Sequence, residues 1–178
     1  TQELAKALIA EGVQVSILTS ERAATQDAST TLSQIRVMPS MRNWDWSSWR
    51  TVTNLAHTLQ VDWLHVQYQT AAYGMHPAIN FAPWWWRRQG LHVAWTYHDL
   101  RVPYLFPKAG HQVRTWVTER AAHDAHLAIV TNEGDRRTLA GKGMHVVSIP
   151  IGSNIQGVAL TPEQRSARRR QRGYGESD

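Results

Sequence analysis

Residues 91–108 contain the feature that most constrains the fold, a short apolar run that ends abruptly in polar side chains. Val93 to Trp95 forms the centre of the run, and Thr96-Tyr-His-Asp99 follows directly. Pro103 and Pro107 then keep the next stretch out of regular structure, because proline lacks an amide hydrogen and restricts the residue before it. A buried strand that ends in His and Asp and opens into a loop is typical of open parallel sheets, which bind ligands beyond the carboxyl ends of their strands.

The remaining sequence supplies further strands and helices in alternation. Apolar spacing, glycine stops and capping residues predict helices within 1–11, 45–59, 70–89, 113–121 and 132–141, and strands at 13–19, 35–38, 62–66, 93–95, 125–130 and 144–149. This alternation predicts an α/β fold with a parallel sheet and right-handed crossovers. The first helix has no strand before it, although a βαβ unit begins with one.

Composition narrows the class of protein. The 178 residues fit one domain, or one domain and the start of another, and 42% apolar residues suffice for a core. Cysteine is absent, which excludes thiolate chemistry and fits a cytoplasmic protein. No apolar run reaches the ~18 residues of a membrane span. Residues 1–160 hold 14 basic and 11 acidic side chains, so the body is only mildly basic and a nucleic-acid-binding surface is not expected.

Five short segments, taken in their order along the chain, carry a resemblance to a known protein family. They are Gly12-Val-Gln-Val-Ser-Ile-Leu-Thr19, Asp62-Trp-Leu-His-Val-Gln67, Thr96-Tyr-His-Asp99, Ala128-Ile-Val-Thr-Asn132 and Ile149-Pro-Ile-Gly-Ser-Asn154. Together they resemble the N-terminal, acceptor-side domain of glycosyltransferase family 4, which has the GT-B fold. The resemblance implies a Rossmann-like parallel sheet flanked by helices over residues 1–155. Residues 156–178 then form a basic linker toward a C-terminal donor-binding domain that the sequence does not contain.

The resemblance also implies an activity. Family members move a sugar from a nucleotide-sugar to an acceptor hydroxyl and retain its anomeric configuration, and this half binds the acceptor. It implies no cofactor besides the nucleotide-sugar co-substrate, and nothing in the sequence requires a metal. Family members begin with a strand that lies mid-sheet, so the chain is expected to be truncated at both ends, inactive alone and poorly stable.

Candidate site residues follow from the strand ends. His98 resembles the family's cleft histidine, and near neutral pH an imidazole can donate to a sugar hydroxyl or to the charge that develops during the reaction. Asp99 either orients His98 or caps the loop, and a histidine bonded only to backbone is the structural alternative. Amides and phenols suit sugar hydroxyls. The expected substrate-binding residues are Gln67, Tyr68, Gln69, Tyr73, Gly74, Asn132, Gly152, Ser153 and Asn154.

Nine tryptophans require an interpretation. Most are expected in the core: Trp46, Trp49 and Trp116 lie on apolar helix faces, and Trp63 and Trp95 lie within strands. The run Trp84-Trp-Trp86 with Arg87-Arg88 differs, because three adjacent indoles span most of a helix and one should be exposed. Indoles beside arginines suit peripheral contact with the inner membrane face, where a lipid-linked acceptor would be found. Packing against a neighbouring domain or helix is the alternative.

Other functions remain open at this stage. The same two-domain fold serves nucleotide-sugar epimerases, and a non-catalytic module that binds a glycan or a protein partner is a further alternative. His123 and His126 do not form a metal-binding motif, and the sequence lacks both Gly-x-Gly-x-x-Gly and a Gly-Lys-Ser phosphate loop, so neither a dehydrogenase nor an ATPase is indicated. The arginines of residues 165–172 lack interleaved aromatic residues, which favours a solvated linker helix over nucleic-acid binding.

Overall fold

The computed structural model describes residues 2–22, 35–100, 110–152 and 160–174. Its elements, in chain order, are α1 (Gln2–Ala10), β1 (Ser16–Ser20), β2 (Arg36–Met41), α2 (Ser48–Thr58), β3 (Trp63–Tyr68), the 3₁₀ helix η2 (Thr70–Tyr73), α3 (Ala78–Arg88), β4 (His92–Tyr97), α4 (Gly110–Asp124), β5 (Leu127–Val130), α5 (Glu133–Ala140), β6 (Val146–Ser148) and α6 (Pro162–Gln171). All strands among the described residues pair in parallel, so the predicted Rossmann-like α/β class is confirmed.

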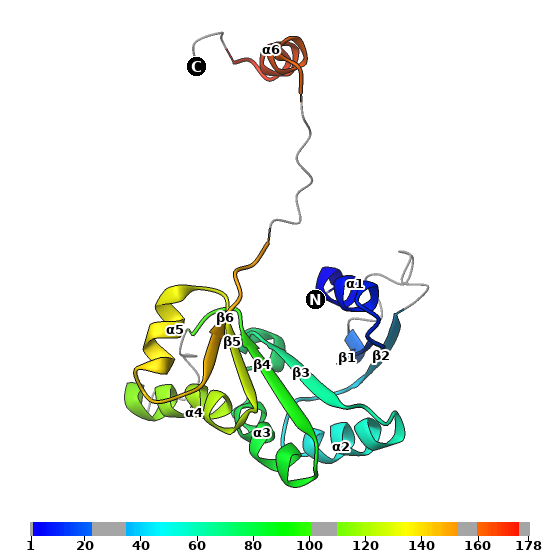
Figure 1. Ribbon diagram of the computed structural model, residues 1–178, viewed down its shortest axis with the longest axis vertical. Helices are drawn as coiled ribbons and strands as arrows, with labels where there is room; N and C mark the ends of the chain where they lie inside the picture. The colour runs from blue at the N-terminus through cyan, green and yellow to red at the C-terminus, as the bar shows by residue number, and fades with distance from the viewer. Residues whose placement is uncertain (1, 23–34, 101–109, 153–159, 175–178) are drawn as a thin grey trace.

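The strands form two sheets rather than one. β1 pairs with β2, and a second sheet has the order β3-β4-β5-β6 (Figure 1). The segments that follow β2 and β3 lie close together: Trp44, just after β2, packs edge-on against Tyr73 of η2, with ring centroids 4.8 Å apart. Leu18 of β1 and Met41 of β2 also contact the same core as β3 and β4. The two sheets therefore share one core without sharing a backbone ladder.

The outer and inner edges of these sheets differ in character. β2 carries Pro39 and a register shift, and β6 has three residues; proline, irregularity and shortness are the features that protect a natural sheet edge. β1 and β3 contain neither proline nor a charged Lys, Arg, Asp or Glu side chain. Their unpaired edges thus have the sequence of interior strands.

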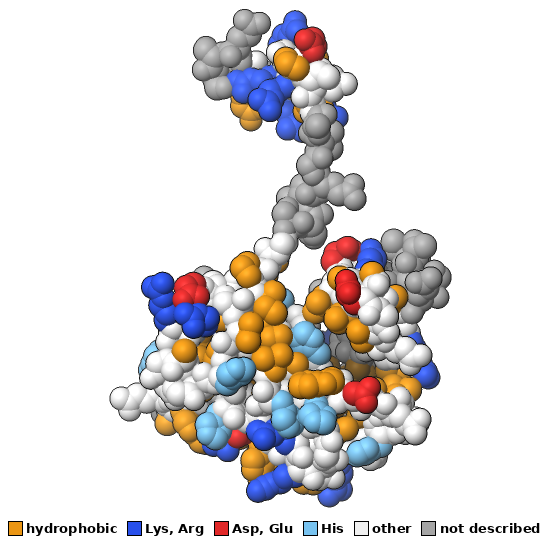
Figure 2. Space-filling model, in the orientation of Figure 1, with side chains coloured by type: hydrophobic (Ala, Val, Ile, Leu, Met, Phe, Trp, Pro, Cys, Tyr) orange, Lys and Arg blue, Asp and Glu red, His pale blue; other side chains and the backbone are white. Residues whose placement is uncertain are grey.

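Helices α2 to α5 pack on one face of the β3–β6 sheet. The core on that face contains Val66, Trp95 and Val130 from the strands, with Ile79 and Leu139 from α3 and α5. Trp95 is 0% exposed. The opposite face carries the alternate residues of the same strands, and Figure 2 shows hydrophobic and histidine side chains gathered there. Helix packing on a single face explains why strand alternation is so regular.

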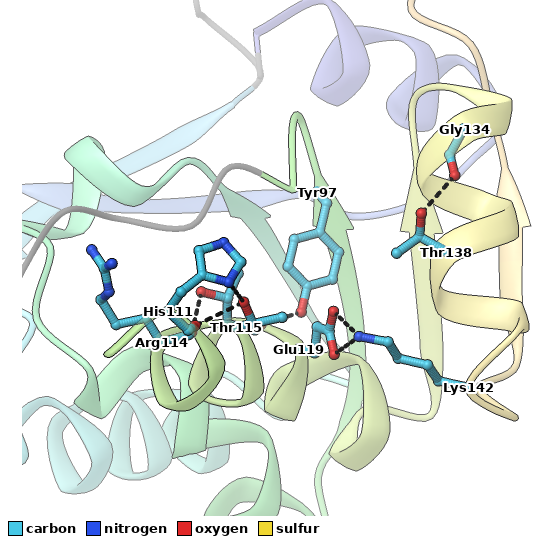
Figure 3. Close-up of polar contacts among 9 residues, drawn as sticks. Tyr97, His111, Arg114, Thr115, Glu119, Gly134, Thr138 and Lys142 are labelled. Atoms are coloured by element: carbon cyan, nitrogen blue, oxygen red, sulfur yellow. Dashed lines mark hydrogen bonds and ion pairs between the residues drawn. The ribbon is translucent and has the colours of Figure 1, made fainter. Parts of the chain in front are cut away.

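One tyrosine joins the sheet to the helical layer. The Tyr97 hydroxyl, fully buried, donates to the carbonyl of Thr118 at 2.7 Å and accepts from the amide of Ala122 at 3.2 Å, so it lies between two groups of consecutive turns of α4. Burial raises the pKa of this phenol well above its usual value. Figure 3 shows Tyr97 reaching α4 and the nearby Lys142–Glu119 pair, which ties α5 to α4. The last residues of β4 are therefore held rigidly.

The prediction that most tryptophans lie in the core is only partly right. Trp95 is buried and Trp49 is half-buried, but Trp46, Trp63 and Trp116 are 52%, 51% and 54% exposed. Trp63 lies on the sheet face that none of the described helices covers. Trp46 and Trp116 both contact Phe81 of α3 and leave more than half of their surface exposed. Periodicity identifies the side on which a residue lies, but not whether anything packs there.

The C-terminal helix α6 lies in the region for which the sequence predicts a basic linker, and it is rich in arginine. In α6 a capping box joins Thr161 and Gln164, and none of its residues is buried. Figure 1 shows it away from both sheets. Among the described residues, no helix has the length and apolar character needed to cross a bilayer.

Candidate functional site

The carboxyl ends of β3 and β4 bring two of the expected residues together. Parallel pairing sets Gln67 opposite Thr96, and His98 comes two residues further along on the same side of the sheet. The Nε2 atom of His98 is 3.1 Å from Oε1 of Gln67. The predicted convergence of an imidazole and a carboxamide at this edge is therefore present in the structure.

A second histidine, missed by the sequence analysis, extends this contact. His65 lies two residues before Gln67 on β3, and its Nε2 is 2.8 Å from Nε2 of Gln67 and 2.8 Å from the Thr96 hydroxyl. The side chains thus form a continuous chain in the order Thr96, His65, Gln67, His98. The sequence signal was available: alternate residues of two paired strands share a face, and polar residues recur on it.

The backbone around His98 is held from both neighbouring strands. Its amide donates to the carbonyl of Tyr68 at 3.3 Å, and its carbonyl accepts from the hydroxyl of Thr131 at 3.1 Å. These contacts extend the β3–β4 ladder by one residue and connect it to the end of β5. The backbone position from which the imidazole extends is therefore fixed at the sheet edge, which favours a defined orientation toward a ligand.

Two of the residues expected to bind substrate, Tyr68 and Tyr73, pack against the strands next to the site rather than lining it. Tyr68 is buried with Trp95 and Tyr97 on the helix-covered face, so the prediction that its phenol faces the crevice is wrong. The alternation of a strand places its side chain opposite that of Gln67. The Tyr73 hydroxyl donates to the carbonyl of Gln67 at 3.2 Å, and burial raises the pKa of this phenol. Gly74 adopts a left-handed conformation (φ 61°) that ends η2.

The other expected residues are spread along the same edge. Gln69 is exposed after β3, Asp99 is half-buried after His98, and Gly152 is exposed beyond β6. Asn132 caps α5: its side chain accepts from the amide of Asp135 at 2.8 Å and donates to the carboxylate of Asp135 at 2.8 Å. That cap was predicted and occupies the polar atoms proposed for substrate. Ser153 and Asn154 lie outside the described residues.

The electrostatics of the site are those of neutral hydrogen-bonding groups. Desolvation, with a smaller contribution from the nearby His98, lowers the pKa of His65, which favours the neutral form of this imidazole. Within the described ranges, no group of three or more His, Asp or Glu side chains is arranged to hold a metal ion. The site has the chemistry to bind hydroxyl groups and exchange a proton with them.

Comparison with known proteins identifies the family. Residues 1–156 match the sequence profile of Glycosyltransferase Family 4, which is most of the chain. The chain belongs to glycosyltransferase family 4. No curated protein and no solved structure matches it. Membership of glycosyltransferase family 4 gives this α/β domain a glycosyltransferase-type function.

Proposed function

We propose that this domain is the acceptor-binding half of a retaining glycosyltransferase that takes a sugar from a nucleotide-sugar. The observation that carries the proposal is the His98–Gln67 pair at the carboxyl edge of a parallel sheet. Such edges bind ligands in open α/β folds. The second half of the enzyme would hold the diphosphate of the donor, so the groups on this domain face an uncharged hydroxyl.

The side chains fit this role chemically. An acceptor hydroxyl must be oriented toward the sugar and lose its proton during transfer. His98 has an imidazole nitrogen that can accept a hydrogen bond from that hydroxyl and take up its proton. Gln67 contacts Nε2 of the His98 ring, and the contacts from Tyr68 and Thr131 fix the backbone of His98. Asp99, the adjacent residue, belongs to the same proposed catalytic segment.

A titration of the chain can test the assignment of the acceptor to this half. We expect methyl and octyl glycosides to shift the ring signals of His98 and the amide signals of Gln67 in nuclear magnetic resonance spectra, whereas UDP-glucose and GDP-mannose leave them unchanged. A transfer assay with the longer enzyme then reads the anomeric configuration of the product. Shifts produced by the nucleotide-sugars alone, or epimerised nucleotide-sugar without a glycoside product, would contradict the proposal.

We further propose that one more parallel strand, continuous with α1, lies between β1 and β3. Three observations support this: the segments that follow β2 and β3 lie close together, the two sheets share one core, and β1 and β3 lack the residues that protect a sheet edge. A strand joined to α1 would complete a right-handed βαβ unit with β1 as its second strand. Its carboxyl end would then lie beside Gln67, so the completed sheet would supply another wall of the site.

The outer side of α2 and α3 fits an anionic bilayer surface. Trp46, Trp49, Arg50 and Trp85 line a shallow hollow of about 440 Å³. Trp84, which precedes Trp85 on α3, is 40% exposed. The guanidinium of Arg88 lies 4.2 Å from the centre of the Trp84 ring. We name these six residues the Trp–Arg patch. Exposed indoles that carry arginines suit the interface between headgroups and acyl chains, so we propose peripheral contact with the inner membrane face.

Vesicle binding tests the Trp–Arg patch. We expect the chain to sediment with vesicles containing phosphatidylglycerol and not with pure phosphatidylcholine. Replacing Trp84 and Arg88 together by alanine should lower the partition coefficient about tenfold, since one indole and one charge are removed. Trp63→Ala is the control, because that tryptophan is also exposed, at 51%, but lies on the opposite side of the sheet. Equal binding to neutral vesicles, or equal loss in the control, would favour a protein partner instead.

A further inference from the structure

The chain of contacts from Thr96 to His98 has a property that depends on the direction of its hydrogen bonds. Gln67 lies between two imidazoles, with its amide nitrogen 2.8 Å from Nε2 of His65 and its amide oxygen 3.1 Å from Nε2 of His98. A carboxamide donates only through nitrogen and accepts only through oxygen. Each end of the Gln67 carboxamide therefore determines whether the histidine nitrogen that faces it carries a proton.

The assignment of protons follows from these rules. The amide nitrogen of Gln67 donates, so Nε2 of His65 must be an unprotonated acceptor and its proton lies on Nδ1. The amide oxygen accepts, so Nε2 of His98 must carry a proton. If Nε2 of His65 carried the proton instead, two donors would face each other at 2.8 Å, and Gln67 would have to turn over. Turning it would present the amide nitrogen to His98 and reverse its tautomer.

We propose that His65 is a positioning residue that, acting through Gln67, selects the Nε2-protonated tautomer of His98 and leaves Nδ1 as its basic nitrogen. The inference deepens the proposed function and rests on it for its significance, because it names which nitrogen of His98 meets the acceptor hydroxyl. The lowered pKa of His65 supports it, since a neutral ring is needed at the acceptor end. The Thr96 hydroxyl, 2.8 Å from the same nitrogen, can donate to it as well.

The tautomers can be read directly, without substrate. In protein labelled with ¹⁵N at histidine, long-range proton–nitrogen correlation spectra distinguish a protonated ring nitrogen from an unprotonated one. At pH 7 we expect His98 to be protonated at Nε2 and His65 at Nδ1. The exposed His57 of α2 serves as an internal reference, because it lies away from the site. This measurement uses no substrate, so a failure to detect acceptor binding would not change the tautomers observed. The proposed function and the tautomer assignment can therefore be contradicted separately.

Two variants at Gln67 and His65 complete the test. In Gln67→Glu the carboxylate accepts at both ends, so His98 should keep its Nε2 proton while His65 moves its own proton from Nδ1 to Nε2. In His65→Ala the amide loses its fixed acceptor, and His98 should become a mixture of tautomers. Thr96→Val is the matched control, because it removes the hydroxyl without touching Gln67, and His98 should not change. A His98 tautomer that is unaffected by His65→Ala, or an unchanged His65 in Gln67→Glu, would overturn the inference.

Discussion

Replacement of His98 by alanine is expected to lower the turnover number of the intact enzyme by about two to four orders of magnitude, the range for loss of a general acid or base. The reason is positional as well as chemical. The backbone of His98 is bonded to Tyr68 and Thr131, and its ring is bonded to Gln67, so no other described imidazole occupies this place at the edge of β4. Steady-state rates with saturating donor and acceptor give the measurement.

The control for this experiment is a histidine that lies away from the site. His57→Ala on the outer side of α2 should leave the rate unchanged. His98→Gln gives a second comparison, because it keeps a polar group that can bond but cannot take up a proton near neutral pH. If His98→Ala retained most of the rate, His98 would not take part in the reaction. If His98→Gln restored full rate, its role would be restricted to hydrogen bonding.

The order of helices and strands could be predicted from the sequence because each element carries its own signal. The run that ends at Thr96-Tyr-His-Asp99 becomes β4, and Asn132 caps α5 as expected. Periodicity does not show which other element, if any, packs against each face of a strand or helix. Trp63 and Trp95 both lie in strands, yet one faces uncovered sheet and the other the helical layer. The division of the strands into two sheets also depends on pairing between distant segments, which local patterns do not specify.

The candidate site was predicted in outline and missed in detail for the same reason. That β3 and β4 meet at one edge follows from parallel topology, so Gln67 and His98 were both named. The phase of β3 was not known, and a shift of one residue exchanges the two faces of a strand. Tyr68 was therefore expected in the crevice but lies in the core, whereas His65, two residues from Gln67, was overlooked. The register of Gln67 against Thr96 resolves both points.

Supplying the proposed strand between β1 and β3 is expected to slow hydrogen exchange at one set of β3 amides by about a hundredfold or more, because those amides would gain partners in the interior of a sheet. The amide of His98 bonds to the carbonyl of Tyr68, so the even-numbered residues of β3 face β4. Alternation then directs the backbone groups of Trp63, His65 and Gln67 to the unpaired edge, where the Gln67 carbonyl meets the hydroxyl of Tyr73 instead of a strand.

The experiment joins a designed strand of about six alternating valine and threonine residues to the start of α1 through a short glycine–serine linker. Protection should appear at Trp63, His65 and Gln67, while Leu64 and Val66, already paired with β4, serve as references within the same strand. The same insert with a central proline cannot complete the ladder and should restore rapid exchange. Uniform protection of all five amides would indicate general stabilisation, and unchanged exchange would show that the strand does not lie beside β3. Selective protection of the odd-numbered residues requires a hydrogen-bonding partner at this edge, because only their amides point there.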